Sequence, residues 1–323
     1  MDRTAPNLYH CGMFIKSIIS AAAVLTAFAA PLQSGAHGAA VTAPRIAQFT
    51  VLPGAVAQAA SQSGNLQPLG CSPRSSEPNA ADVGPATQTQ IIYFVPNGEI
   101  DECLDQGPLI GSMNSLNAFF SAQGLGALRV DRVSNPTTGA MDIPFVRGNN
   151  TQGSYTGVSP IASELSSRGY NVSGKRYIIF ATVDRGGVCG QAEFPGRYAV
   201  FFLNSAEGCG VRDFGDGTLA GAGAAEVVSG QEILHNEGVV SLFAPNGCQV
   251  SLLHFGHVCT PGGVLVEFGQ LDPESVDIMF PYAIPGLRLS QKVVDRNRDD
   301  YFQTSDNIWP VNLIDLEDSP YFL

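Results

Sequence analysis

Gln231, Glu232 and His235 have residue types and a spacing that suggest hydrolytic chemistry at a metal ion. They belong to the stretch QEILHNEG, residues 231–238. In a helix, positions i and i+4 lie on one face, and position i+1 lies about a quarter turn away. Gln231 and His235 would therefore share a face, with Glu232 beside it. An imidazole on such a face can ligate zinc, and a neighbouring carboxylate can accept a proton from a zinc-bound water.

The stretch departs at one position from the pattern H-E-x-x-H, in which two His on one helical face bind the same zinc ion. Gln231 stands where the first His would be. A Gln amide oxygen is a neutral, hard donor, whereas zinc prefers imidazole or thiolate, so we expect weakened zinc binding. Taken alone, the stretch also fits a structural interpretation, in which Gln231 hydrogen-bonds His235 and Glu232 is solvated.

Residues toward the C-terminus could complete a metal site. Gly238 would let the chain leave the helix and turn back, so that a later residue supplies a further ligand. The segment SLLHFGHVCT contains His254 and His257, and Met279 could form an apolar floor below the metal. His254 offers an alternative third imidazole beside His235 and His257. A shared zinc ion requires ring nitrogens of His235 and His257 within roughly 3–4 Å of each other.

In this order, the residues resemble the metzincin clan of zinc metallopeptidases, which carry H-E-x-x-H, a Gly, a third His and a later Met-turn. The chain is more closely similar to secreted bacterial zincin-like proteins, over about residues 88–323. In that group the motif helix is followed by an Ala-Pro loop, a Gly-His segment near a Cys, an Asp-x-Met turn and an Asp-Ser-Pro tail. The matching residues here are Ala244 with Pro245, Gly256 with His257 and Cys259, Asp277 with Met279, and Asp318 with Ser319 and Pro320.

The resemblance implies that His235 and His257 bind zinc, that Glu232 is the general base, and that Met279 is the Met-turn residue. Because Gln231 replaces the first ligand, we expect a metallopeptidase-like pseudoenzyme whose peptidase activity is weak or lost, and which binds a peptide or protein in the former substrate cleft. One alternative is an active zinc endopeptidase in which Gln231 or His254 is the substitute ligand. Another is a non-enzymatic, disulfide-stabilised secreted binding protein.

The hydrophobic pattern predicts an α/β fold of the mixed α+β kind. Helices are expected near residues 112–123, 161–168 and 221–238, and strands at QIIYFVP, LRVDRV, DIPFVRG, RYIIFATV and RYAVFFLN. This order describes a mixed, twisted sheet with helices packed against it. The resemblance implies a metzincin-like or zincin-like version of this fold, with an active-site helix and a loop-rich C-terminal subdomain.

The N-terminal residues have the form of a secretory signal. Arg3 and Lys16 precede an apolar run from Ile18 to Ala30 that is too short to span a bilayer. We expect residues 1–30 to be a signal peptide. Residues 31–88, rich in Ala, Ser, Gly, Pro and Gln, are expected to be a low-complexity linker or pro-segment, and residues 89–323 a metzincin-like catalytic-type domain.

Cysteine content and charge agree with a secreted protein. The chain has seven cysteines, and removal of Cys11 with the signal leaves an even set suited to an oxidising compartment. Neighbours in sequence favour the pairs Cys71–Cys103, Cys189–Cys209 and Cys248–Cys259. The formal net charge of -12 argues against nucleic acid or a membrane as partner, since both demand basic patches.

Overall fold

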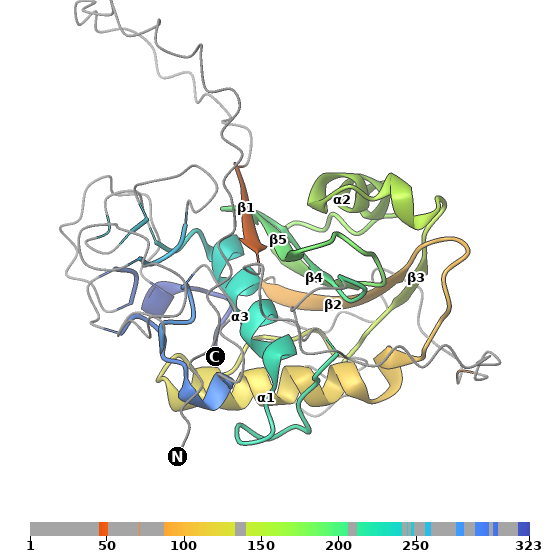
Figure 1. Cartoon of the computed structure of the whole chain (residues 1–323). Coiled ribbons are helices and arrows are strands. Elements are labelled where there is room, and N and C mark those ends of the chain that lie inside the picture. Colours follow the sequence, from red (N-terminus) through yellow and green to blue (C-terminus); the bar gives the residue numbers. More distant parts are fainter. Residues whose placement is uncertain are drawn as a thin grey trace, which may run out of the picture. The chain divides into compact units, whose positions relative to one another are not determined.

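A mixed sheet, six-stranded within the described residues, lies at the centre of the computed structural model (Figure 1). The strands in spatial order are β1 (Arg45–Thr50), β5 (Val188–Phe194), β6 (Tyr198–Phe202), β4 (Lys175–Ala181), β2 (Gln88–Val95) and β3 (Phe145–Arg147). Strands β6, β4, β2 and β3 are parallel, whereas β5 is antiparallel to both of its neighbours, β6 and β1. The fold is therefore a mixed α/β arrangement, as the sequence predicts.

The structure describes residues 45–50, 71, 87–132, 140–205, 212–240, 244, 247–248, 256–259, 276–280, 288–296, 300–302 and 316–323. All of them belong to one compact unit, Ala43–Leu323. The expected signal peptide, residues 1–30, and the alternative ligand His254 lie outside the described residues. None of the described helices has the length and hydropathy needed to cross a bilayer.

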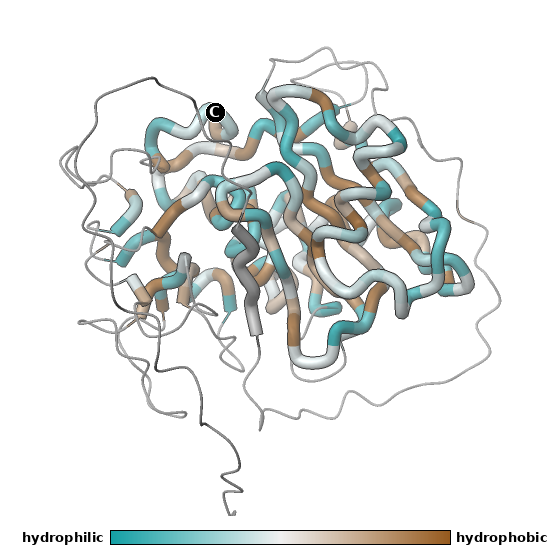
Figure 2. Tube along the Cα trace, turned by 90° about the horizontal axis from the view of Figure 1, so that it is seen from above, coloured by the Kyte–Doolittle hydropathy of each residue, from teal (hydrophilic) through white to brown (hydrophobic). Residues whose placement is uncertain are grey.

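Helices cover both faces of the sheet, and side-chain alternation along the strands creates a core on each. Ile91 and Tyr93 of β2 share one core with residues of α1 (Pro108–Ala122) and α3 (Ala224–Glu237). Ile92 and Phe94 point to the opposite core, which includes α2 (Val158–Ser167). Figure 2 shows hydrophobic segments alternating with hydrophilic ones along the described trace. The short 3-10 helices are η1 (Leu104–Gln106), η2 (Gln152–Ser154), η5 (Leu289–Gln291) and η6 (Leu316–Asp318).

The strongly apolar elements agree with the sequence predictions, and the weakly patterned ones do not. Strands β2, β4 and β6 and all three predicted helices are present. LRVDRV is not a strand in its described part, residues 128–132, which makes only isolated bridges with Thr89, Met141 and Phe322. DIPFVRG contributes only the three residues of β3. Two strands, β1 and β5, were not predicted, because β1 lies in a low-complexity region and Gly190 interrupts the pattern of β5.

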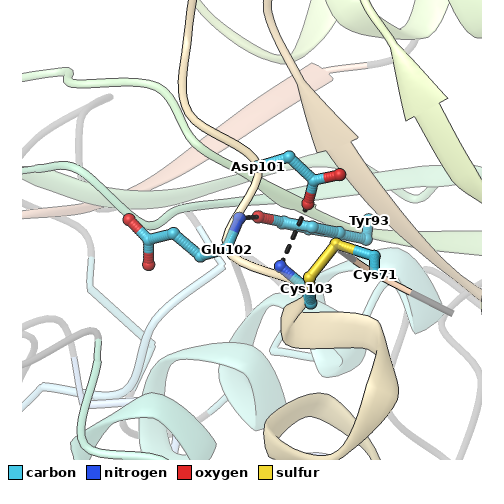
Figure 3. Close-up of a disulfide and its surroundings, with 5 residues drawn as sticks. All are labelled: Cys71, Tyr93, Asp101, Glu102 and Cys103. Carbon is cyan, nitrogen blue, oxygen red and sulfur yellow. Dashed lines mark hydrogen bonds between the residues drawn. A yellow bond between two sulfur atoms is a disulfide. The ribbon is translucent and has the colours of Figure 1, made fainter. Parts of the chain in front are cut away.

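Two of the expected disulfides are present, Cys71–Cys103 and Cys248–Cys259. The first ties Cys71 to the turn before α1, where Asp101 Oδ1 accepts a hydrogen bond from the Cys103 amide at 3.0 Å (Figure 3). Cys189 is also disulfide-bonded, and its expected partner, Cys209, lies outside the described residues. The disulfides agree with an oxidising compartment.

Candidate metal and catalytic site

The helix α3 is buried along almost its whole length, which determines the environment of every candidate residue on it. It contacts β5 and β6 on one side and α1 on another. It ends at Gly238, whose φ of 79° is the left-handed conformation that favours glycine. Glu232 is only 1% exposed. The solvated Glu232 of the structural interpretation is therefore wrong, since the sheet covers the face that carries it.

The rings of His235 and His257 converge, as a shared metal ion requires. Their Nε2 atoms lie 3.2 Å apart, and both side chains are fully buried. Two imidazoles bound tetrahedrally to one zinc ion, with Zn–N distances of about 2.0–2.1 Å, have nitrogens about 3.3 Å apart. The same separation also allows a hydrogen bond between one protonated and one unprotonated ring nitrogen. The pair can thus exist without metal and needs almost no movement to bind one.

Burial, followed by the neighbouring His257, holds the pKa of His235 well below its usual value of 6.5. His235 is therefore neutral at physiological pH. A neutral imidazole is the form that ligates a metal ion. The electrostatic environment thus suits ligation even though His235 is fully enclosed by protein.

Three features position His257 although it lies far from α3 in sequence. Gly256 has a φ of 83°, and a Cβ there would lie 3.1 Å from Nδ1 of His235, so glycine permits the close approach. The carbonyl of His257 accepts a hydrogen bond from the Cys248 amide at 2.9 Å. The Cys248–Cys259 disulfide encloses the same short segment. His257 is therefore held by covalent and hydrogen-bonded connections on both sides.

Met279 lies in a turn that connects His257 to α3. The carbonyl of Met279 accepts a hydrogen bond from the Val258 amide at 3.0 Å, and its own amide donates to Asp277 Oδ1 at 2.7 Å. The next residue, Phe280, accepts a hydrogen bond through its carbonyl from Nε2 of Gln231 at 3.1 Å. The turn thus contacts both the residue after His257 and the motif helix. The structure thus brings the motif helix, the His257 segment and the Met279 turn together.

Gln231 does not pair with His235, contrary to the structural interpretation of the motif. Its amide group is fixed by the hydrogen bond to Phe280, and its Oε1 atom is buried without a hydrogen-bond partner among the described residues. The oxygen is the only Gln atom able to ligate a metal ion. Gln231 therefore fastens α3 to the Met279 turn and leaves one weak donor atom available.

The carboxyl group of Glu232 is buried without a partner. Neither oxygen has a hydrogen bond to any described residue. Burial raises the pKa of Glu232 well above its usual value of 4.5, which favours the protonated form of its carboxyl group. A buried, unpaired carboxyl group costs about 1–3 kcal/mol, and such costs are concentrated at functional sites. Burying this carboxyl group does not stabilise the fold. A buried, unpaired carboxyl group is typical of a site that binds a ligand or cation.

The C-terminal tail holds the end of α3 close to His235. Ser319 Oγ donates a hydrogen bond to Glu237 Oε2 at 2.7 Å, and Arg176 of β4 forms an ion pair with the same carboxylate. The ring of Tyr321 lies over the Arg176 guanidinium, 3.9 Å from its centre. The Asp-Ser-Pro tail seen in the sequence thus anchors the last turn of α3.

The described donors provide only part of a catalytic zinc site. Such a site uses three protein ligands and an open position, and the described residues contribute two imidazoles, His235 and His257. A third imidazole is not present at the pair within the described chain. Elsewhere in the described chain, ligand atoms of Cys71, Asp101 and Cys103 lie within 4.8 Å of one another and could hold a metal ion, but the two sulfurs form a disulfide.

Sequence reasoning assigned no role to three residues that shape this site. Gly190 of β5 makes room for Glu232, Phe280 binds Gln231, and Tyr301 donates to Asp277 Oδ1 at 2.7 Å below the Met279 turn. Only Gly190 left a signal, since an isolated Gly within a strand often marks a close approach by another group. Backbone carbonyl contacts such as that of Phe280 leave no signal in residue type.

No protein family model and no curated protein matches this chain.

Proposed function

We propose that this chain is a secreted, metzincin-like zinc-metallopeptidase homologue with an incomplete metal site. Its peptidase activity is weak or lost, and its cleft binds a peptide or protein ligand. Two observations carry the proposal: His235 and His257 approach to 3.2 Å, and the buried carboxyl group of Glu232 on the same helix has no hydrogen bond to any described residue. Two converging imidazoles and an unpaired carboxyl group are costly to bury together, unless they serve or once served a ligand.

When bound, zinc would supply Lewis acidity and a water of lowered pKa. His235 and His257 would hold the ion through their Nε2 atoms. Gln231 contributes at most its carbonyl oxygen, a donor that zinc accepts poorly. Burial raises the pKa of Glu232 well above its usual value and so favours its protonated form. The protonated form, which the raised pKa favours, cannot act as a general base, so this shift and the poor donor at Gln231 both support weak or absent hydrolysis.

One observation favours an active zinc endopeptidase as the second candidate. Oε1 of Gln231 is buried without a hydrogen-bond partner among the described residues, and it projects from the same helix face as His235. An oxygen in that position can serve as a third, weaker ligand. A bound cation would also lower the pKa of Glu232 and restore its capacity to accept a proton. The alternative that uses His254 concerns a residue outside the described chain.

A binding protein with no history of metal chemistry explains the site least well. Such a protein gains nothing from burying Glu232, whose carboxyl group has no hydrogen bond to any residue that the structure describes. It also has no need for Gly256 beside the His235 ring. The disulfides and the signal-like N-terminus support secretion under every one of the three functions.

The decisive experiment measures zinc content and peptide cleavage for the secreted wild type, Gln231→His and Glu232→Ala. We expect substoichiometric zinc and little cleavage in the wild type, and near-stoichiometric zinc in Gln231→His. Stoichiometric zinc with Glu232-dependent cleavage in the wild type would instead establish the active endopeptidase. If Gln231→His is folded but gains no zinc, the metzincin-like assignment is wrong.

A further inference from the structure

The N-terminal strand β1 covers the outer edge of β5. The two strands are antiparallel, with Ile46 opposite Glu193, Ala47 opposite Ala192 and Phe49 opposite Gly190. In Figure 1, β1 lies beside β5 at the end of the sheet. Without β1, strand β5 would be the edge of the sheet and would present unpaired N–H and C=O groups to a passing chain.

This edge lies beside the candidate site. Gly190, the backbone partner of Phe49, is also the residue against which Glu232 packs. Helix α3 itself contacts β1. The backbone of β1 therefore runs along the strip of β5 that borders Glu232. An extended peptide that paired with β5 would lie along that same strip, since main-chain pairing with a sheet edge fixes its path.

Strand β1 lies at one end of the described sheet. Within the described sheet β1 pairs only with β5, and three strands separate it from β2, the next strand in sequence. A strand held by one neighbour at a sheet edge is among the least stable parts of a fold. Residues 51–87 connect β1 to β2, and Cys71 within that connection is bonded to Cys103 before α1. The disulfide therefore links the connection between β1 and β2 covalently to Cys103.

We propose that β1 is a displaceable strand that occupies the β5 edge in place of an extended peptide, and that the Cys71–Cys103 bond determines which backbone cuts release it. A cut within residues 51–70 leaves β1 without a covalent link to the rest of the fold, so it dissociates. A cut within residues 72–86 leaves β1 attached through the disulfide, so it stays. The identity of the replacing peptide rests on the proposed function, whereas the release of β1 does not.

The test uses the full chain with a site for a specific protease inserted in one of two places. The first variant carries the site within residues 53–70, and the second within residues 72–86. A third variant combines the second site with Cys71→Ser/Cys103→Ser. After cutting and gel filtration, mass spectrometry detects the N-terminal fragment, and hydrogen exchange reports on backbone amides of residues 188–194. Circular dichroism before cutting checks that each variant is folded.

We expect the first variant to lose the fragment, and its β5 amides to exchange at least about tenfold faster than before cutting. The second variant should retain both fragment and protection, and the third should behave like the first. Adding a synthetic peptide of residues 43–52 to the cut first variant should restore protection with saturation. The same peptide with Ala47→Pro and Gln48→Pro should not, because adjacent prolines remove a donor that faces β5.

Three results would overturn the proposal. Loss of the fragment without faster exchange in β5 would mean that β1 does not cover this edge. Retention of the fragment by the cut first variant would mean that β1 does not dissociate. Loss of the fragment from the cut second variant would exclude the disulfide anchor. None of these results depends on zinc or on cleavage of a peptide, so they are distinguishable from failure of the proposed function.

Discussion

The carboxyl group of Glu232 occupies the space that a side chain at Gly190 would need. A Cβ atom built on Gly190 would lie 2.5 Å from Glu232 Oε1, closer than real Cβ atoms come to a heavy atom. Glu232, the residue of α3 that resembles a general base, therefore packs directly against Gly190 of strand β5. This contact couples the helix that carries the motif to the strand that β1 covers.

The first prediction concerns that contact. Gly190→Ala should destabilise the protein by about 1–3 kcal/mol, because the added methyl group forces Glu232 or the strand to move. The measurement is the free energy of unfolding in urea. Glu232→Ala/Gly190→Ala is the matched control, since removal of the carboxyl group leaves room for the methyl group. The double variant should show a coupling energy of the same order as the Gly190→Ala loss, and additive effects would contradict the contact.

The second prediction concerns the missing imidazole. Gln231→His should raise zinc affinity at least about 100-fold, because a third imidazole replaces a poor oxygen donor. Competition with a fluorescent zinc chelator measures the affinity. The gain should disappear in Gln231→His/His257→Ala, which again offers only two imidazoles. An equal gain with and without His257 would show that zinc binds elsewhere.

The third prediction separates the two described disulfides. Cys248→Ser/Cys259→Ser should cost about 3 kcal/mol of stability and also weaken zinc binding in the Gln231→His background, because the bond holds the segment of His257. Cys71→Ser/Cys103→Ser is the matched control. It removes a bond that joins Cys71 to the start of η1 and does not enclose the His257 segment, so it should lower stability and leave zinc affinity unchanged. Equal zinc affinities in the two variants would argue against a positioning role for Cys248–Cys259.

The fourth prediction uses Asp277, the buried carboxyl group below the Met279 turn. Burial is the main reason that its pKa is raised from 3.8 to about 7, against the opposing hydrogen bonds from Met279, Tyr301 and Arg296. Between these two pH values the folded state holds a proton that the unfolded state has released. The contribution to stability is therefore fully present below pH 3.8 and is lost as the pH rises to about 7.

Asp277→Asn tests this directly, since the amide does not titrate. The stability of the wild type relative to the variant should fall across that interval by an amount on the order of 4 kcal/mol. Urea unfolding at several pH values provides the comparison. The neighbouring Lys292, whose pKa burial lowers to about 8, titrates above the interval and should not contribute within it. A pH-independent difference between the two proteins would contradict the raised pKa.

The sequence alone predicted the strongly apolar strands, the motif helix and two of the disulfides. The apolar runs that form β2, β4 and β6 predicted buried strands, and the helical spacing placed Gln231, Glu232 and His235 on α3. The pairs Cys71–Cys103 and Cys248–Cys259 followed from sequence proximity. Each of these predictions depends on residues close together in the chain, where backbone geometry alone relates their positions.

Only the tertiary structure decided how these pieces meet. In the folded chain the Nε2 atoms of His235 and His257 lie 3.2 Å apart. The Gln231 amide donates a hydrogen bond to the Phe280 carbonyl. Glu232 is buried against Gly190. The tertiary structure also placed β1, from a stretch without apolar periodicity, on the edge of β5. Contacts between residues far apart in the chain leave little signal in the local sequence pattern, and backbone hydrogen bonds such as those between β1 and β5 depend little on residue type. The sequence determined which groups are available, and long-range packing determined which are buried, which are paired and which face one another.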